Sequence, residues 1–286
     1  MELVAEDICK SYHNKNLALS HVNMKFTPGI YGLLGPNGAG KSTFINIITD
    51  NIKPDHGQIR YNGANIRSLK DKYRAVVGYM PQQQVLYDNF TGEEFLWYMA
   101  ALKGIKKNVC RNRVNEMLQM VSLWKEKDKK IGSYSGGMKQ RILIAQAMLN
   151  DPEILIMDEP TAGLDPSERI RIRNFLSTIS ENKIIIIATH IVSDIEFIAK
   201  EIILLKDGKV ENAGAPQQLL EEISDKVYEV SVAIDEEYQC DNAKIANIRI
   251  GDNEKVYRVV QDKKTEKYTY QKATAGLEEL YLYYFL

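Results

Sequence analysis

The chain has 286 residues, of which 44% are hydrophobic and 26% are charged, enough for one sizeable buried core and a small second domain. Its net charge is -1 and it has no long block of like charges, which argues against nucleic acid as a partner and against a polybasic membrane patch. The longest apolar runs, such as residues 184–188, fall far short of the roughly 20 residues of a membrane-spanning helix. We therefore expect a soluble globular protein without a membrane span.

The start of the chain and the cysteines indicate the compartment. The first ten residues lack the basic start and the long apolar stretch of a secretory signal. Cys9, Cys110 and Cys240 lie far apart, in odd number and without metal-ligand spacing, which is typical of a reducing cytosol. We interpret the cysteines as packing residues and expect a cytoplasmic protein.

Short strand-like runs and turn signals alternate over about the first eighty residues. Asn62-Gly63, between two extended runs, predicts a hairpin because these residue types readily adopt the positive φ angles of a tight turn. Residues 22–34 predict a pair of strands broken at Pro28-Gly29. The second of these strands ends in an apolar run that leads into a glycine-rich loop.

This loop, residues 35–43 with the sequence GPNGAGKST, matches the phosphate-binding pattern GxxxxGK followed by Ser or Thr. It follows a predicted strand and opens a predicted helix, so that backbone N–H groups and the helix N-terminus face an anion. Lys41 is predicted to bridge the β- and γ-phosphates of a nucleotide, and Ser42 to hold Mg²⁺. The predicted nucleotide-binding residues of the loop are Gly35, Pro36, Asn37, Gly38, Ala39, Gly40, Lys41, Ser42 and Thr43.

The pattern then turns helical, and we expect a helical insert over about residues 83–150. Thr91 is placed to cap a helix that has an acidic first turn and ends at Gly104. Further on, residues 133–141, SYSGGMKQR, look like a second phosphate loop, because Ser135 is a good N-cap and the helix after it presents its positive end to an anion. Since the first loop is complete by itself, the second loop raises the question of which phosphate it binds.

Two near-continuous apolar runs, residues 153–159 and 183–190, predict strands of a sheet that is covered on both faces. A helical stretch over residues 167–180 separates them, which indicates a doubly wound α/β sheet. Asp158 and Glu159 end the first of these strands. We predict that Asp158 steadies Mg²⁺ and that Glu159 orients and deprotonates an attacking water.

Two further polar residues follow predicted strands at the carboxyl edge, where ligands bind in such sheets. His190 is a candidate donor to the γ-phosphate. Gln82 could reach Mg²⁺ or the attacking water, but three consecutive glutamines, residues 82–84, leave open which of them does so.

After about residue 222 the pattern becomes that of half-exposed strands, at residues 226–234, 255–261 and 267–274. A helix follows, whose apolar face carries Leu277, Leu280, Tyr281 and Tyr284. We expect residues 1–222 to form one domain and residues 223–286 to form a small accessory α+β domain.

In their order and approximate spacing, the segments GPNGAGKST, SYSGGMKQR, ILIMDEP, TAGLD and ATH resemble the ATP-binding subunit of an ABC transporter, over residues 1 to about 222. The resemblance implies an ATPase with an α/β P-loop NTPase core, an antiparallel β subdomain and a helical insert. It implies that Tyr12 stacks on adenine, with ordinary strand packing as the alternative. It also makes His190 the switch histidine and Gln82 the link from the site to the membrane subunit.

The resemblance answers the question of the second loop. Members of this family pair head to tail, so that the signature residues Ser135, Gly136 and Gly137 of one chain cap the γ-phosphate held by the other chain's P-loop. Asp165 lies in the loop that communicates across the dimer. ATP is then expected to join a homodimer, or a heterodimer with a paralogous ATPase. The signature here begins with Tyr and ends with Met, where many members have Leu and Gln.

Without a predicted span, transport would need a separate transmembrane permease, with this chain peripheral on the inner face of the cell membrane. The aromatic residues of the insert are the expected docking surface, although core packing explains them about as well. The segments SGGMKQR and DEPTAGLDP and the C-terminal helix look most like the branch that exports drugs, peptides and antibiotics. A soluble ATPase with a role such as cluster assembly is the alternative.

Overall fold

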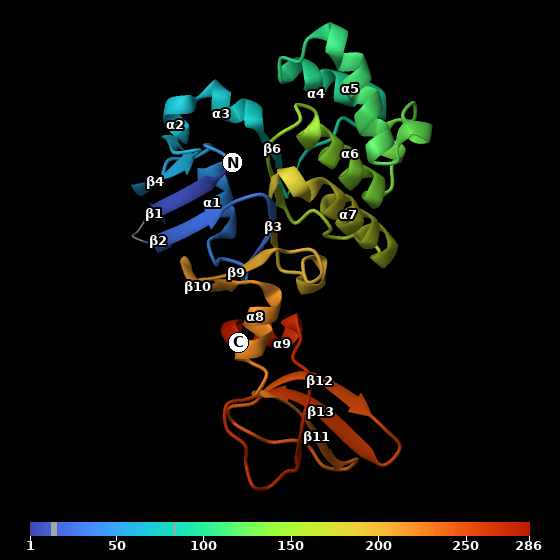
Figure 1. The fold of residues 1–286 in the computed structure, drawn as a ribbon. Helices are drawn as coiled ribbons and strands as arrows, with labels where there is room; N and C mark the ends of the chain where they lie inside the picture. The colour runs from blue at the N-terminus through green and yellow to red at the C-terminus, as the bar shows by residue number, and fades with distance from the viewer. Residues whose placement is uncertain (13–15, 83) are drawn as a thin grey trace.

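The computed structural model describes residues 1–12, 16–82 and 84–286, and its strands form three sheets (Figure 1). The first is antiparallel, with the order β2-β1-β4-β5. Its strands are β1 (Leu3–Tyr12), β2 (Asn16–Phe26), β4 (His56–Tyr61) and β5 (Ala64–Asn65). The hairpin predicted at Asn62 and Gly63 is confirmed, with φ angles of 47° and 81° between β4 and β5.

The central sheet has the order β10-β9-β3-β8-β7-β6, and all of its ladders are parallel except that between β9 and β10. Its strands are β3 (Gly29–Leu34), β6 (Val77–Met80), β7 (Ile154–Asp158), β8 (Ile184–Thr189), β9 (Glu201–Lys206) and β10 (Lys209–Gly214). The two strands predicted over residues 22–34 are present as β2 and β3. They lie in different sheets and do not pair with each other.

Both faces of the central sheet are buried, which explains the continuous apolar runs of β7 and β8. Ile154 and Ile156 belong to the hydrophobic cluster shared with the antiparallel sheet, whereas Leu155 and Met157 belong to the cluster shared with the helical insert. Alternate residues of one strand therefore pack on opposite layers. The helices that surround the sheets are α1 (Lys41–Ile48), α2 (Ile66–Leu69), α3 (Asp71–Val76), α4 (Gly92–Leu102), α5 (Lys107–Met120), α6 (Gly136–Met148) and α7 (Pro166–Ile179).

The helical insert is confirmed as α4, α5 and α6, which stand beside the central sheet at the upper right of Figure 1. The Thr91 hydroxyl accepts a bond from Glu94 N, and the Glu94 side chain accepts one from Thr91 N, so α4 begins with a full capping box. The insert also contains the short 3₁₀ helices η2 (Trp124–Glu126) and η3 (Ile131–Ser133), and two more, η4 (Ser180–Asn182) and η5 (Val192–Asp194), lie before and after β8.

The C-terminal segment forms the third sheet, with the antiparallel order β12-β13-β11-β14. Its elements are β11 (Val227–Ala233), β12 (Lys244–Ile250), β13 (Glu254–Val260), β14 (Tyr270–Lys272) and α9 (Leu277–Phe285), after the connecting helix α8 (Pro216–Glu222). The sequence pattern missed β12, because most of its residues are exposed and the alternation of buried and exposed positions is weak there.

Helix α9 returns from the third sheet, lies below β9 and β10 in the view of Figure 1, and contacts α8 and η5 as well as β12 and β13. Leu277 and Leu280 of α9 belong to the same hydrophobic cluster as Val192 and Ile195. A hydrogen bond of 2.7 Å, which Lys206 Nζ of β9 donates to Tyr284 O of α9, also links the helix to the central sheet. The C-terminal sheet has a separate small cluster of its own. The accessory segment thus combines a sheet that is largely packed by its own cluster, apart from Val227 and Val260 in the main one, with a helix that shares the main core.

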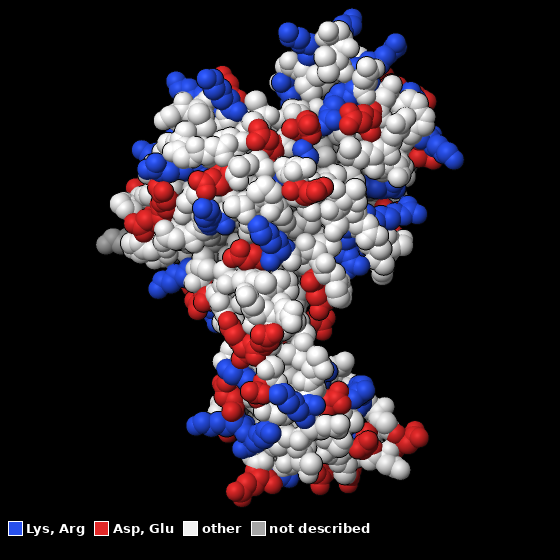
Figure 2. All heavy atoms as spheres, viewed as in Figure 1, with Lys and Arg blue, Asp and Glu red and all other residues white. Residues whose placement is uncertain are grey.

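Acidic and basic side chains are intermingled over the visible face of the molecule (Figure 2). Within the described residues, no helix is both long enough and apolar enough to cross a bilayer.

Candidate functional site

Strand β3 runs directly into the glycine-rich loop, and α1 begins at Lys41. Gly38 and Gly40 have φ angles of 86° and 106°, in the left-handed region that favours glycine. A Cβ at Gly40 would lie only 2.5 Å from Ala18 O of β2, so this position has no space for a side chain either. The loop is therefore packed tightly against the antiparallel sheet, and its turn aims the N-terminus of α1 at the carboxyl edge of the central sheet.

The Lys41 side chain reaches back over the loop that precedes it. Its Nζ donates hydrogen bonds to Gly35 O at 2.6 Å and to Pro36 O at 3.0 Å, and the residue is only 8% exposed. Burial lowers the pKa of Lys41, and the charges of Glu159 and Asp158 oppose that shift. The arrangement places one buried ammonium close to two carboxylates.

Asp158 is the last residue of β7, all five residues of which are buried. Its Oδ2 accepts a 3.4 Å hydrogen bond from Ser42 Oγ in the first turn of α1. Burial, and then the charge of Glu159, raises the pKa of Asp158 above its usual range. A hydroxyl and a carboxylate from two different elements thus converge at the end of the glycine-rich loop.

Glu159 adopts a left-handed backbone with a φ angle of 53°, which is strained for a side chain of this kind. Its N donates to Ala188 O at 2.8 Å, so the backbone stays attached to β8 while the chain turns. The carboxylate accepts hydrogen bonds from Thr189 Oγ1 at 3.2 Å and from His190 N at 3.1 Å, and Oε1 lies 2.7 Å from His190 Nδ1. The Glu159 carboxylate is therefore fixed in position by the end of β8.

These elements enclose a pocket of about 240 Å³. It is lined by Tyr12, Ala18, Asn37, Gly38, Ala39, Gly40, Lys41, Ser42, Thr43, Gln82, Asp158 and Glu159. The structure thus brings together residues 37–43 of the predicted phosphate loop, both predicted carboxylates, Gln82 and the exposed ring of Tyr12, whereas the predicted site residues Gly35, Pro36 and His190 are not among the lining residues. Of the three consecutive glutamines, Gln82 lines the pocket, Gln84 is not among the lining residues, and Gln83 lies outside the described residues.

The second predicted phosphate loop lies elsewhere on the chain. Ser135 caps α6 by accepting a 3.2 Å hydrogen bond from Met138 N, which confirms the predicted N-cap. Asp165 caps the neighbouring helix α7 by accepting a bond from Glu168 N. Neither these caps nor Gly136 and Gly137 are among the described residues that line the pocket.

Three residues at this edge escaped the sequence reasoning. Ala18 enters the pocket because the strand β2 runs past the loop, and a small apolar residue carries no signal for that. Thr161, just after Glu159, donates to the carboxylate of Asp194, whose pKa is raised by burial. This pair holds the segment after β7 against η5, and only the fold brings the two residues together.

The chain matches a family model described as ABC transporter over residues 19–162. It is 35% identical over 234 residues to the uncharacterized ABC transporter ATP-binding protein YxlF of Bacillus subtilis (strain 168), a match that covers 80% of this chain and 76% of that protein. It is 29% identical over 287 residues to ABC transporter A family member 6 of Arabidopsis thaliana. That match covers 98% of this chain but only 31% of the plant protein.

Two solved cassettes share the fold at 29% identity. The structure of cbiO1 from Clostridium perfringens, part of the ABC transporter complex cbiONQ, matches with a TM-score of 0.70 over 77% of this chain and 90% of that chain. The dimeric structure of MJ0796, a bacterial ABC transporter cassette, matches with a TM-score of 0.67 over 75% of this chain and 98% of that chain. These likenesses confirm the α/β cassette fold with several sheets that the sequence predicts.

The different surroundings of Gly38 and Gly40 give a test of the loop geometry. Gly40→Ala should lower the free energy of unfolding by more than Gly38→Ala. Both variants place a Cβ on a left-handed residue, at a cost of about 1–2 kcal/mol. Only in Gly40→Ala does the added Cβ also meet the Ala18 carbonyl oxygen. At Gly38 no described atom lies within 4 Å of the added Cβ. Urea denaturation of both variants measures the difference, and equal destabilisation would contradict the tight packing at Gly40.

Proposed function

This chain belongs to the ABC transporter family as an ATP-binding ATPase cassette, and from that premise we propose that it powers export of a drug, peptide or lipid-like compound through a separate membrane permease. The observation that carries the mechanism is the pocket in which Lys41, Asp158 and Glu159 converge at the carboxyl edge of the central sheet. A triphosphate is the ligand that uses a buried ammonium, a helix N-terminus and a metal-binding carboxylate together.

The residues at the pocket's end fit Mg²⁺ as a companion of ATP. Ser42 and Asp158 supply the oxygen donors that this hard cation prefers, and they already lie within hydrogen-bond distance of each other. Burial, and then the charge of Glu159, raises the pKa of Asp158, and a bound cation would favour its carboxylate form. When bound, Mg²⁺ would neutralise charge that develops on the β- and γ-phosphates. Gln82, which also lines the pocket, is placed to reach the metal or the attacking water.

The remaining groups of the pocket have assigned roles in binding and hydrolysis. Lys41 bridges the β- and γ-phosphates, and the exposed ring of Tyr12 at the pocket receives adenine. Glu159 accepts the proton of the attacking water, because Thr189 and His190 hold its carboxylate at the edge of the pocket. His190 contacts the γ-phosphate and couples it to Glu159.

The signature loop is assigned to the other half of a dimer. Gly136 supports this assignment, since a Cβ there would approach only Leu164, at 4.0 Å, among the described atoms. Nothing within the described chain therefore requires glycine at this position, whereas close approach of a phosphate from a second chain would. Ser135 and Gly137 complete the N-terminus of α6, and Asp165 at the start of α7 communicates across the dimer. The MJ0796 cassette, which matches this chain, has been solved as a dimer, and this supports a twofold pairing here.

The division of labour along the chain follows from these assignments. Residues 1–222, with the helical insert over about residues 83–150, carry ATP binding and hydrolysis. Residues 223–286 are assigned as an accessory domain whose separate sheet has its own hydrophobic cluster, while its helix α9 packs into the main core. The cassette works on the cytoplasmic face of the cell membrane, attached through the permease, and pairs with a second copy or with a paralogous ATPase.

The sequences of the signature and carboxylate segments support export rather than import. Exposed apolar residues that follow Gln82 in the chain support a docking surface for the permease. Val85 is 86% exposed, and Tyr87 and Tyr98 are 44% and 39% exposed in an aromatic group on the helical insert. Exposed apolar side chains grouped in this way favour a partner helix rather than water.

The base assignment predicts a specific variant phenotype. Glu159→Gln keeps the shape and removes the base, so ATP turnover should fall about 100-fold or more while ATP-bound dimers accumulate. Phosphate release and size-exclusion chromatography with ATP and Mg²⁺ measure the two effects. Glu153→Gln, the same change at the opposite end of β7, is the matched control and should keep nearly normal turnover. Normal turnover in Glu159→Gln would rule out this residue as the base.

The transport role is tested with the chain in its native membranes. Affinity purification after detergent extraction should recover a polytopic membrane protein in fixed ratio, and Val85→Asp should lower that recovery without changing ATP binding. Ile250→Asp, on the exposed face of the C-terminal sheet, is the control and should leave it unchanged. Inverted vesicles with the purified complex should accumulate the cargo with ATP. Fixed-ratio recovery of soluble proteins alone would contradict a transporter role and favour cluster assembly.

A further inference from the structure

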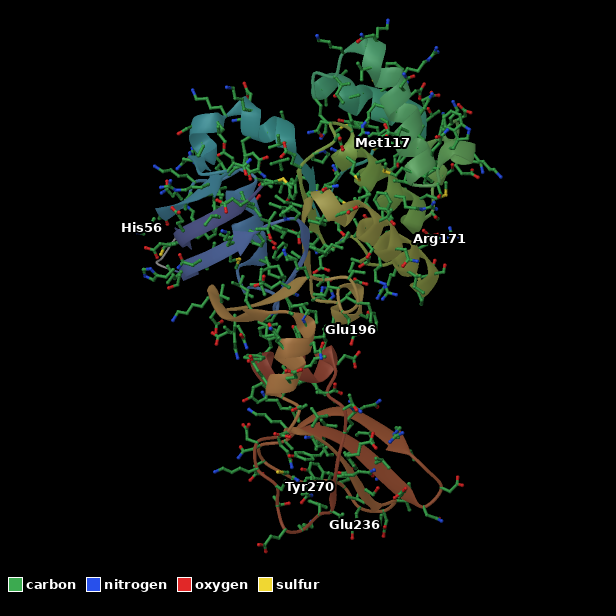
Figure 3. The ribbon with its side chains drawn as sticks, in the orientation of Figure 1. His56, Met117, Arg171, Glu196, Glu236 and Tyr270 are labelled. Carbon is green, nitrogen blue, oxygen red and sulfur yellow. The ribbon has the colours of Figure 1, made fainter. Side chains whose placement is uncertain are left out.

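Four polar side chains from the three long strands of the antiparallel sheet meet at a point outside the lining of the nucleotide pocket. The ligand atoms of Asp7, Cys9 and His21 all lie within 4.8 Å of one another. His21 Nδ1 lies 2.7 Å from Asp7 Oδ1, and His56 Nε2 lies 3.0 Å from Asp7 Oδ2. Figure 3 shows His56 at the outer edge of this sheet. One carboxylate is therefore held between two imidazole rings, next to a thiol.

The backbone is distorted to bring these side chains together. Asp7 and His21 both have φ angles of 52°, in the left-handed region, which among residues other than glycine is adopted most readily by Asn, Asp and His. The ladder between β1 and β2 shifts register between Ala5 and Ile8, around Asp7. Gly57, next to His56, has a φ angle of 82°, and a Cβ there would lie 2.3 Å from Asp7 O. Bulges of this kind re-aim side chains, and here they aim them at one point.

The hydrogen bonds of the cluster do not account for this distortion. The side chains of His21 and His56 are 72% and 68% exposed, and that of Asp7 is 44% exposed. Exposed ion pairs and hydrogen bonds of this type contribute little to stability because water competes for both partners. The register shifts around Asp7 and the convergence of these side chains on one point are therefore better explained by a ligand.

The ligand atoms of Asp7, Cys9 and His21 are of the types that bind zinc. A thiolate, an imidazole nitrogen and a carboxylate oxygen are the ligands of zinc, which takes them in a tetrahedral arrangement at about 2.0–2.3 Å. Ligand atoms around such an ion lie roughly 3.3–3.8 Å apart, so side-chain shifts of less than about 1 Å convert the observed cluster into a coordination shell. His21 N also donates a 3.3 Å hydrogen bond to Cys9 Sγ, so the sulfur already lies against the backbone of β2.

We propose that Asp7, Cys9 and His21 form a zinc site on the antiparallel sheet, with His56 donating to the carboxylate and holding it toward the metal. Water fills the fourth position. Binding releases the thiol proton of Cys9 to solvent, and His21 coordinates as the neutral imidazole. The hydrogen bond from His56 orients a ligand from outside the coordination shell, as such contacts commonly do at zinc sites.

The residues of the zinc site are close in sequence to residues that line the nucleotide pocket, but the two sites share no side chain. Tyr12 and Ala18, which line that pocket, lie three residues from Cys9 and from His21 on the same strands. A zinc ion would join β1 to β2 at the level from which both strands continue to the pocket. Cys9 was interpreted from the sequence as a packing residue because the three cysteines lie far apart and show no metal-ligand spacing. The approach of His21 to Asp7 and Cys9 depends on the pairing of β1 with β2.

The test uses the full-length, tag-free chain after removal of metals with a chelator. Cobalt is the probe, since it replaces zinc and gives a thiolate-to-metal charge-transfer band in the near ultraviolet only when sulfur is a ligand. We expect this band to saturate at about one equivalent per chain, and zinc to abolish it by displacement. Metal held by oxygen donors in the nucleotide pocket gives no such band.

The variants are chosen to keep the fold. Cys9→Ser should abolish the band, whereas Cys240→Ser, at a partly exposed cysteine of the C-terminal domain, should leave it intact. His21→Asn and Asp7→Asn retain a residue type that tolerates the left-handed backbone and should weaken zinc binding about tenfold or more. His56→Gln should weaken it less than either. Circular dichroism checks that each variant is folded.

Two results would overturn the proposal. One is a folded wild-type chain without a charge-transfer band under saturating cobalt, even if zinc binds elsewhere. The other is a band that survives unchanged in Cys9→Ser or in His21→Asn.

Discussion

The structure depends on one electrostatic constraint, the confinement of the Lys41 ammonium and of the Asp158 and Glu159 carboxylates within a single sheet edge. Removing a charge from water costs several kcal/mol, and attraction between buried charges offsets that cost only with good geometry. Here burial lowers the pKa of Lys41 and raises that of Asp158, so both charged forms are disfavoured by their surroundings. A site like this contributes little to stability, and its charges are explained by the triphosphate that we propose it binds.

The fold supplies the geometry that this constraint needs. Parallel strands end at one edge, so β3, β7 and β8 deliver the phosphate loop, the two carboxylates and His190 to the same place. Tight packing of Gly40 against Ala18 ties the loop to the antiparallel sheet, and the turn at Glu159 is held to β8 through Ala188. The pocket is thus built by rigid elements, and the groups proposed to act on a γ-phosphate from a second chain stand apart on α6 and α7.

The sequence predicted what depends on local chemistry. The glycine pattern of residues 35–43 predicted a loop whose left-handed glycines the structure shows, and Ser135 was a predictable N-cap because its cap bond spans three residues. It did not predict contacts made by the fold alone. Ala18 enters the pocket, and Asp7 meets His21 and His56, through strands that pair across the sheet. The exposed strand β12 left too weak an alternation to detect.

The central claim is that each ATP is held between the P-loop of one chain and the signature helix of another. Lys41→Ala disables the first half of a site and Gly136→Asp disables the second by adding bulk and negative charge. In a Glu159→Gln background, each variant alone should trap almost no nucleotide, whereas an equal mixture forms heterodimers with one intact site. Up to about half of the trapped nucleotide per heterodimer should then return, since one site of two is restored. If the mixture trapped no more than either variant alone, both halves would lie within one chain and the account would be wrong.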